Sequence, residues 1–240
     1  MGTLIQGGKY QVLEVMEEQD GYKACLCIDV ETNNHYRPMI FNIYEKSEDI
    51  KRLLPVFYDI DRGQCTDFVH VMSGKHYITA AFEHHQGEGL RDFFSRMDKY
   101  DFEMRCSYAY LLLEQCLILD AVDDFIAYAC LEPVNIVVSE KLQKVMINYM
   151  IRPQRNDGES KGKKLAVLLE CIFVDNRYVP QLLWEYIGSL RENEGLSIAA
   201  AFSRWKEIGA QLLKEHRDLK KEALIAYLFR RLKRAFMRKG

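Results

Sequence analysis

The sequence predicts an α+β fold in which one antiparallel sheet precedes a mostly helical part. Two patterns carry this prediction. Five short segments within residues 9–82 are rich in β-branched and aromatic side chains and are separated by polar turns, whereas from residue 102 onward apolar residues recur at helical spacing. With 240 residues, 48% of them hydrophobic and 28% charged, the chain can bury a core of ordinary globular composition.

The first part of the chain supplies the sheet and one helix. The turn "EEQDG" separates the first two strands, and "SGK" separates the last two. A helix is expected over 47–59, after the third strand, with Ser47 as its N-cap and Glu48 and Asp49 in its first turn. The five strands are expected at 9–16, 22–30, 35–44, 66–72 and 76–82.

The second part is mostly helical. A short helix begins at "GLRDFFSRM", and residues 102–121 form the longest apolar-striped helix of the centre. The stretch "AYACLEPVNIVVSE" (127–140) is a tight polar turn that feeds a β-branched run, and a second short strand follows within 142–151. Residues 152–164 are a polar, glycine-bearing loop. Four further helices are expected near 163–173, 179–192, 197–216 and 218–236.

Charge is divided unevenly along the chain. The net charge is −2, but residues 214–240 carry ten Lys or Arg against three acids, a local +7, so residues 1–213 sum to −9. From Ala223 onward there are six basic residues and no acid. Such a basic terminus suits an anionic partner, whether membrane headgroups or nucleic acid.

The cysteines and the termini indicate a cytoplasmic setting. Seven scattered cysteines do not form a disulfide framework, and no second pair at ligand spacing accompanies Cys25-x-Cys27, so neither disulfides nor a structural metal are expected. The N-terminus lacks the apolar stretch of a signal peptide, and no run of about 18 apolar residues exists to span a membrane.

The turn within residues 127–140 contains the sequence frame Leu131-x-Pro133-x-Asn135. Together with the element order, it resembles the catalytic loop of a protein kinase domain, in a degenerate form. The resemblance implies a bilobal fold, with a five-stranded antiparallel N-lobe carrying one helix (1–83) and a reduced, mostly helical C-lobe ending in a basic helix (84–240). Phosphoryl transfer in that family depends on a lysine, two metal ligands and a carboxylate near the acceptor hydroxyl.

The residues that the resemblance assigns to this chemistry are altered. Tyr128, Ala129 and Cys130 replace His-Arg-Asp, and a neutral thiol cannot take the part of the catalytic carboxylate. Glu132 places a negative charge where kinases commonly carry a lysine. Asn148 replaces the aspartate of Asp-Phe-Gly, and an amide oxygen is a weaker magnesium ligand than a carboxylate.

The N-lobe is altered in the same way. The register chosen for the third strand places Phe41 in the lysine position, where it is expected to fill the pocket, and the inserted helix has "LLPV" (53–56) in place of the partner glutamate. Gln19, Gly21 and Ala24 fall at the three glycine positions of the phosphate loop, where side chains hinder backbone contact with phosphate.

These replacements predict a catalytically inactive scaffold that binds other proteins and no cofactor. The alternative is an atypical kinase or nucleotide-binding regulator that uses Asn135 and Asn148 as weak cofactor ligands, Lys46 or Lys23 as the cation, and the linker "FEHHQGEG" to cradle a base. A nucleophilic role for Cys130 is disfavoured, because no Cys-His-Asn pattern accompanies it.

The C-terminal helix allows three interpretations. It can pack on the core through a stripe of Leu224, Tyr227, Leu228, Leu232 and Phe236; it can lie beside an anionic membrane; or it can bind nucleic acid, which the acidic remainder of the chain disfavours. A reduced kinase-like module before a single membrane anchor resembles the cytosolic part of the EssB/YukC component of type VII secretion in Gram-positive bacteria. The basic residues facing a membrane or partner are Arg230, Arg231, Lys233, Arg234, Arg238 and Lys239.

Overall fold

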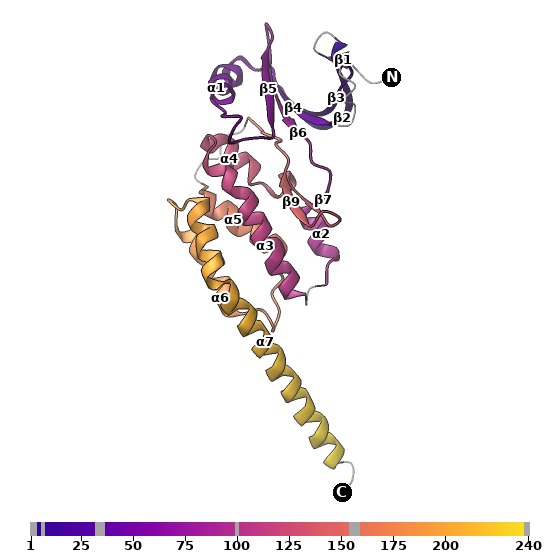
Figure 1. Cartoon of the computed structure of the whole chain (residues 1–240), viewed down its shortest axis with the longest axis vertical. Coiled ribbons are helices and arrows are strands. Elements are labelled where there is room, and N and C mark those ends of the chain that lie inside the picture. Colours follow the sequence, from indigo (N-terminus) through magenta and orange to yellow (C-terminus); the bar gives the residue numbers. More distant parts are fainter. Residues whose placement is uncertain (1–3, 6–7, 32–36, 99–100, 154–158, 238–240) are drawn as a thin grey trace.

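The computed structural model describes residues 4–5, 8–31, 37–98, 101–153 and 159–237, with side chains from Gly8 to Ala223. Figure 1 shows a small lobe formed by a sheet and one helix above a larger helical lobe, from which a long helix projects. Arg238 and Lys239, two of the basic residues singled out above, lie outside the described residues.

The small lobe is built on one antiparallel sheet, as predicted. Its strand order is β1-β2-β3-β4-β6-β5, and the helix α1 follows the third long strand. The two-residue strand β1 at the edge was not predicted. The strands are β1 (Leu4–Ile5), β2 (Tyr10–Gln19), β3 (Tyr22–Asp29), β4 (Met39–Tyr44), β5 (Phe68–Ser73) and β6 (Ile78–Glu83).

The sheet is curled around an apolar interior. Tyr10 in β2 and His70 in β5 stack with ring centroids 5.9 Å apart, although three strands lie between β2 and β5 in the sheet order. Phe41 in β4 contacts both rings, at 4.8 and 6.1 Å. Because side chains alternate along a strand, the neighbours Ile40 and Asn42 lie on the opposite face.

Helix α1 (Ser47–Tyr58) packs beside the sheet through Leu53 and Phe57, which are almost fully buried. The predicted N-cap was wrong by one residue: the N-cap is Lys46, no side chain caps the helix, and Ser47 is the first helical residue. Glu48 and Asp49 do lie in the first turn, where carboxylates complement the helix dipole.

The helical lobe is wrapped around α3. The expected helix over 102–121 is divided, because it ends at Cys116 and continues as a 3₁₀ turn over Leu117–Asp120. The three-stranded sheet β7-β8-β9 lies beside α3. The elements are β7 (Glu88–Gly89), α2 (Leu90–Arg96), α3 (Phe102–Cys116), β8 (Ile136–Ser139), β9 (Lys144–Ile147), α5 (Lys161–Ile172) and α6 (Gln181–Glu192).

The stretch quoted above is partly helical. Its first residues belong to α4 (Asp124–Cys130), whose N-cap Asp123 accepts a hydrogen bond from the Phe125 N–H at 2.8 Å. A 3₁₀ turn over Pro133–Asn135 then leads into β8. Pro133 suits the first position of this turn, since its missing N–H needs no partner there.

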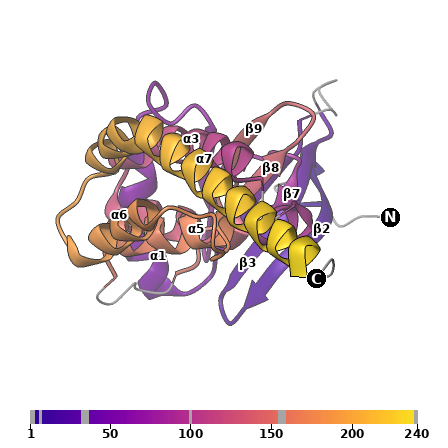
Figure 2. The same cartoon turned by 90° about the horizontal axis from the view of Figure 1, so that it is seen from below.

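Helix α7 (Ile198–Met237) is one continuous helix of 40 residues, so the prediction of two helices over 197–216 and 218–236 was wrong. Its first half packs on α3 and α6, and its second half extends away from both lobes (Figures 1 and 2). No helix in the described part of the chain combines the length and apolar character needed to cross a membrane.

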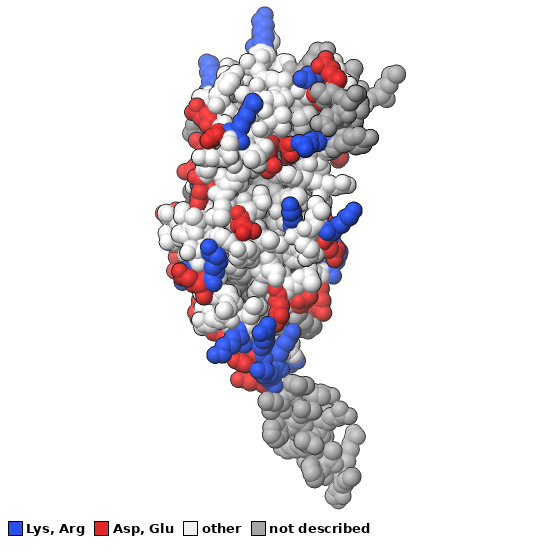
Figure 3. Space-filling view, viewed as in Figure 1, with Lys and Arg blue, Asp and Glu red and all other residues white. Residues whose placement is uncertain are grey.

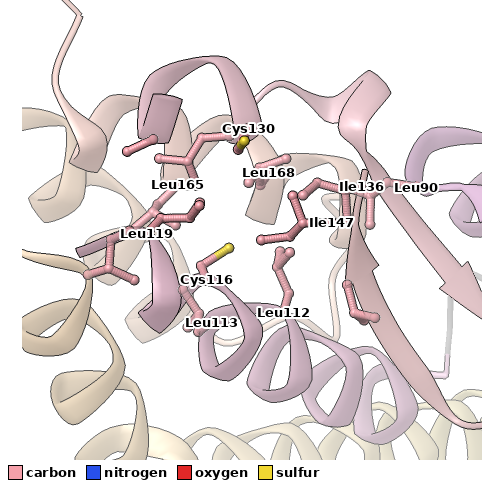
Figure 4. Packing of buried hydrophobic residues seen from close by; sticks show 14 of the residues in the cluster. Leu90, Leu112, Leu113, Cys116, Leu119, Cys130, Ile136, Ile147, Leu165 and Leu168 are labelled. Atoms are coloured by element: carbon pink, nitrogen blue, oxygen red, sulfur yellow. The ribbon is translucent and has the colours of Figure 1, made fainter. Parts of the chain in front are cut away.

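The two lobes share one main core. Figure 4 shows its centre, where Leu112, Leu113 and Cys116 of α3 meet Leu165 and Leu168 of α5. The same cluster of buried residues continues through Tyr149 to Phe82 and Phe57 of the small lobe. A second, smaller cluster fills the curled sheet and contains Tyr10, Cys25, Cys27, Met39, Phe41 and Ala81.

Arg105 of α3 is a buried cation that joins three segments of the helical lobe. It is 1% exposed, and its guanidinium donates hydrogen bonds to the carbonyl oxygens of Phe94 (3.2 Å), Met97 (3.0 Å), Asp98 (3.4 Å) and Ile172. These carbonyls lie at the C-terminal ends of α2 and α5, where a positive charge is favourable.

We predict that Arg105→Met lowers the free energy of unfolding by about 3 kcal/mol, because four carbonyls, those of Phe94 and Ile172 among them buried, lose their donor. The control is Arg191→Met, which removes a half-exposed ion pair with Glu170 and should cost less than about 1 kcal/mol. Urea denaturation of both variants measures the difference. Equal losses would show that Arg105 does not hold these helix ends together.

Candidate functional site

The lobes meet along the segment 148–151, which directly follows β9. Asn42 of β4 reaches this segment from the small lobe: its Nδ2 donates to the Tyr149 carbonyl at 2.7 Å, and its Oδ1 accepts from the Ile151 N–H at 2.7 Å. Tyr22 also donates its hydroxyl to the Asn42 Oδ1, at 2.9 Å. Asn42 is completely buried, and a buried amide needs hydrogen-bond partners. Its side chain finds them in the backbone of this segment, where it both donates and accepts, as a neighbouring strand would.

Asn135 holds the same segment from the helical lobe. Its Nδ2 donates to the carbonyls of Ala129 (2.7 Å) and Met150 (3.0 Å), and its Oδ1 accepts from the Met150 N–H at 3.3 Å. Asn135 is 1% exposed. Its amide therefore ties the end of α4 to the backbone of the segment.

Asn148 reaches from the segment to the linker between the lobes. Its Oδ1 accepts from the His85 N–H at 2.8 Å, and its Nδ2 donates to the His85 carbonyl at 3.1 Å. The side chain is 4% exposed. We call Asn42, Asn135 and Asn148 the asparagine clamp, because each amide binds both backbone groups of another part of the chain.

Aromatic side chains fill the space around the clamp. Tyr149 stacks on Phe82 of β6, with ring centroids 4.6 Å apart and planes inclined by 5°. Tyr44 donates its hydroxyl to the Ile151 carbonyl at 2.5 Å, and Cys65 contacts the Tyr149 hydroxyl at 3.8 Å. Burial raises the pKa of the Tyr149 hydroxyl well above its usual range, so this hydroxyl stays neutral.

Phe41 does not occupy this interface. The prediction that it fills the pocket between the lobes was wrong by one residue, because Phe41 faces the interior of the curled sheet with Tyr10 and His70. Asn42 is the residue of β4 that points to the segment 148–151. Strand alternation explains the error, since a shift of one position moves a side chain to the other face.

Cys130 lies at the end of α4 inside the main core. It is completely buried, and burial raises its thiol pKa well above the ordinary value. Figure 4 shows its sulfur among the apolar side chains that surround Leu165 and Leu168. A protonated, inaccessible thiol is a poor nucleophile.

Glu132 is paired with a cation from another helix. Lys164 of α5 contacts the Glu132 carboxylate and also Glu159, at 2.6 Å. Burial acts to lower the pKa of Lys164, but hydrogen bonds to the two carboxylates outweigh it and the pKa is raised. The negative charge of Glu132 is thus compensated within the chain.

The β2–β3 turn does not form an open loop. Asp20 and Gly21 are its only residues between the strands, and Gly21 adopts φ +75°, a left-handed conformation that glycine reaches without steric cost. Lys46 pairs with Asp20 at 2.8 Å, and Lys23 pairs with Glu18 at 2.9 Å. Both lysines considered as substitutes for the missing cation therefore bind carboxylates at this turn.

The linker histidines have separate surroundings. The His85 ring contacts Asp67 at 3.1 Å, and this hydrogen bond raises the His85 pKa. Burial lowers the pKa of His84. In the described part of the chain, no group of three or more His, Cys, Asp or Glu side chains is arranged to hold a metal ion.

A surface groove of about 460 Å³ lies in the helical lobe, next to the end of the segment 148–151. The start of α2 and the turn around Pro133 line it, together with Arg152, which pairs with Glu17 of β2 at 2.6 Å. Sequence reasoning missed Arg152, Asn42 and the backbone of His85 as parts of this region. The polar Asn42 within the apolar run "MIFNIY" was the one signal for a buried hydrogen-bonding role.

Comparison with known proteins identifies the fold class. No family profile matches the sequence, and neither does any curated protein. Among solved structures, the crystal structure of Rad53 residues 1–466 in complex with AMP-PNP is similar, with a TM-score of 0.61 and 14% sequence identity. The match covers 83% of this chain and 66% of the Rad53 chain. Rad53 is a protein kinase, so the chain has a bilobal protein kinase-like fold.

We predict that Asn148→Ala lowers the free energy of unfolding by about 2–3 kcal/mol, because the half-buried N–H and C=O of His85 lose their partner. Asn148→Asp should cost at least as much, since a carboxylate cannot donate to the His85 carbonyl. The control is Asn193→Ala at the exposed end of α6, with an expected change below about 0.5 kcal/mol. If urea titrations show that the Asn148 variants lose no more free energy of unfolding than the control, the role of Asn148 in the clamp is contradicted.

Proposed function

We propose that this chain is a catalytically inactive kinase-like domain that acts as a scaffold for other proteins. The observation that carries the proposal is the pairing of the Asn148 amide with both backbone groups of His85. A bound base would need the backbone N–H and C=O of His85 in the linker as hydrogen-bond partners. In this chain the Asn148 side chain already binds both groups.

The chemistry of the two amide groups supports this argument. A carboxamide presents one donor and one acceptor side by side, and the edge of adenine presents the same pair. A nucleotide that enters between the lobes would have to displace the Asn148 side chain and separate Phe82 from Tyr149. Both steps cost buried hydrogen bonds or packing before any contact is gained.

The charges around the interface also favour a scaffold. Asn42 stands between the lobes where a cation would be needed for phosphate, and Asp20 brings a carboxylate to the β2–β3 turn. The oxygens of Asn135 and Asn148 already accept backbone hydrogen bonds. Each of these features weakens the alternative of an atypical kinase or nucleotide-binding regulator, although the related Rad53 structure contains AMP-PNP.

We predict that ATP with magnesium does not raise the melting temperature of the chain. A ligand at about 100 times its Kd would stabilise the folded state by about 2.7 kcal/mol, which a thermal-shift measurement detects easily. Magnesium alone and ATP with a chelator serve as controls. A magnesium-dependent rise, or transfer of labelled phosphate to a generic substrate, would instead establish the nucleotide-handling alternative.

We further propose that the domain lies on the cytosolic side of a membrane, as its resemblance to the type VII secretion component implies. The support is the end of α7, whose last part carries basic residues without acids and extends away from the lobes (Figure 1). Clustered Lys and Arg next to a membrane are attracted by anionic headgroups at about 1 kcal/mol per residue.

We predict that the full chain sediments with vesicles containing phosphatidylserine at low salt, and not with neutral phosphatidylcholine vesicles. Arg230→Glu combined with Arg234→Glu should weaken this binding by more than tenfold, because two attractive charges become repulsive. High salt should release the wild-type chain. Equal binding to both vesicle types would remove the support for a membrane position.

A further inference from the structure

A groove of about 340 Å³ lies along the first part of α3, beside the turn that joins β8 to β9. Met104, Tyr108 and Leu111 line it at spacings of four and three residues, so they share one face of the helix. Gln143 of the turn lines it as well. The volume is within the range of about 300–1,000 Å³ that is usual for ligand sites.

Much of the apolar surface at this groove is left uncovered by the chain. Met104 is 43% exposed, Leu111 is half-buried, and Leu142, the neighbour of Gln143 in the turn, is exposed. Large apolar side chains that are exposed together mark places where another molecule binds. The groove is thus a surface that gains free energy when it is covered.

A buried hydroxyl at the groove has no hydrogen-bond partner in the described part of the chain. Tyr108 is 2% exposed, and its ring packs edge-on against Phe93 and Phe94, with centroids 5.1 and 5.6 Å apart. The amide of Gln143 donates to the Glu140 carbonyl at 2.8 Å. The Tyr108 hydroxyl is left without a partner, and a buried polar group in that state costs free energy. The carbonyl of a bound molecule would recover it.

The charged residues that line the groove are both acidic, Asp101 and Glu103. Glu103 is already paired with Arg217 of α7 at 2.9 Å, and Figure 3 shows acidic and basic side chains intermixed where α7 leaves the described surface. Asp101 is the N-cap of α3 and accepts the Met104 N–H at 3.2 Å. Within the described ranges no Lys or Arg forms an ion pair with Asp101, so this carboxylate can still receive a cation.

We infer that the groove binds an extended segment of a partner protein, which presents two apolar side chains on one side and a Lys or Arg at one end. Met104 and Leu111 are seven residues apart, about 10 Å along the helix axis, and three residues of extended chain cover the same distance. Side chains two positions apart in such a segment point to the same side, toward Met104 and Leu111.

The polar groups then find partners as well. When the exposed Gln143 side chain turns aside, a carbonyl of the segment accepts the Tyr108 hydroxyl, and the cation of the segment pairs with Asp101. A lipid fits less well, because its anionic headgroup would be repelled by Asp101. The inference rests on the proposed scaffold function and deepens it, since it names the kind of partner and the surface that holds it.

We predict that a phage-displayed library of random peptides of about 12 residues, selected on the immobilised full chain, enriches this pattern. Synthetic copies of the enriched peptides are then titrated by fluorescence anisotropy. Met104→Lys should weaken their binding about tenfold or more, because a charge replaces an apolar contact. Tyr108→Phe, which removes only the hydroxyl, should weaken it about fivefold. Asp101→Asn keeps an N-cap but should weaken binding about threefold and reduce its salt dependence.

The matched control is Leu13→Lys in β2 of the small lobe, where the side chain is 51% exposed and binding should not change. Urea denaturation of each variant shows whether the fold is kept, and Tyr108→Phe should not lower stability, because the lost hydroxyl has no partner. A library without enrichment, or peptides that bind Met104→Lys as tightly as the original chain, would overturn the inference.

A dimer that Met104→Lys dissociates in sedimentation velocity would also overturn the inference, because a second copy would then be the occupant. These failures are distinct from a failure of the proposed function. A magnesium-dependent rise in melting temperature with ATP concerns the interface between the lobes, whereas the peptide titrations concern the groove on α3.

Discussion

The arrangement of the two lobes depends on buried amide side chains that bind backbone groups. Each residue of the asparagine clamp satisfies a backbone N–H and a backbone C=O that it would otherwise leave without this partner, and a buried group without a hydrogen bond costs about 1–3 kcal/mol. The segment 148–151 is held from the small lobe by Asn42, from the helical lobe by Asn135 and at the linker by Asn148. A single apolar cluster can then pass through both lobes, because their relative position is fixed.

The same constraint explains the distribution of charge. The interface between the lobes contains neutral amides and aromatic rings, since an unpaired ion there would lose its hydration. The ionic groups stand around it instead, as Glu132 with Lys164, Glu17 with Arg152 and Asp20 with Lys46. Between the lobes, the rings of Tyr149 and Phe82 stack on each other beside the neutral amides.

The long helix α7 gives the rigid body a second feature. The first half of α7 belongs to the helical lobe, where His216 and Arg217 contact Phe102 and Glu103 of α3. The second half extends away from the lobe and is basic in sequence. Residues 224–237 thus continue the helix beyond the lobe, and their sequence is basic.

Pattern and composition were sufficient for the order of the elements. Strand alternation, helical spacing and the Leu131-Pro133-Asn135 frame predicted the sheet, the inserted helix and the kinase-like class, because each depends on residues close in sequence. They singled out Asn135 and Asn148 only as weak candidate cofactor ligands of the nucleotide-binding alternative. Only the tertiary structure showed what these amides bind, and that Asn42 rather than Phe41 faces the segment 148–151. The Asn42 contacts join residues 107 and 109 positions apart and the Asn148 contacts residues 63 apart, and the facing of Asn42 depends on one-residue register. The continuity of α7 was likewise decided by packing against α3, which spacing along the chain does not encode.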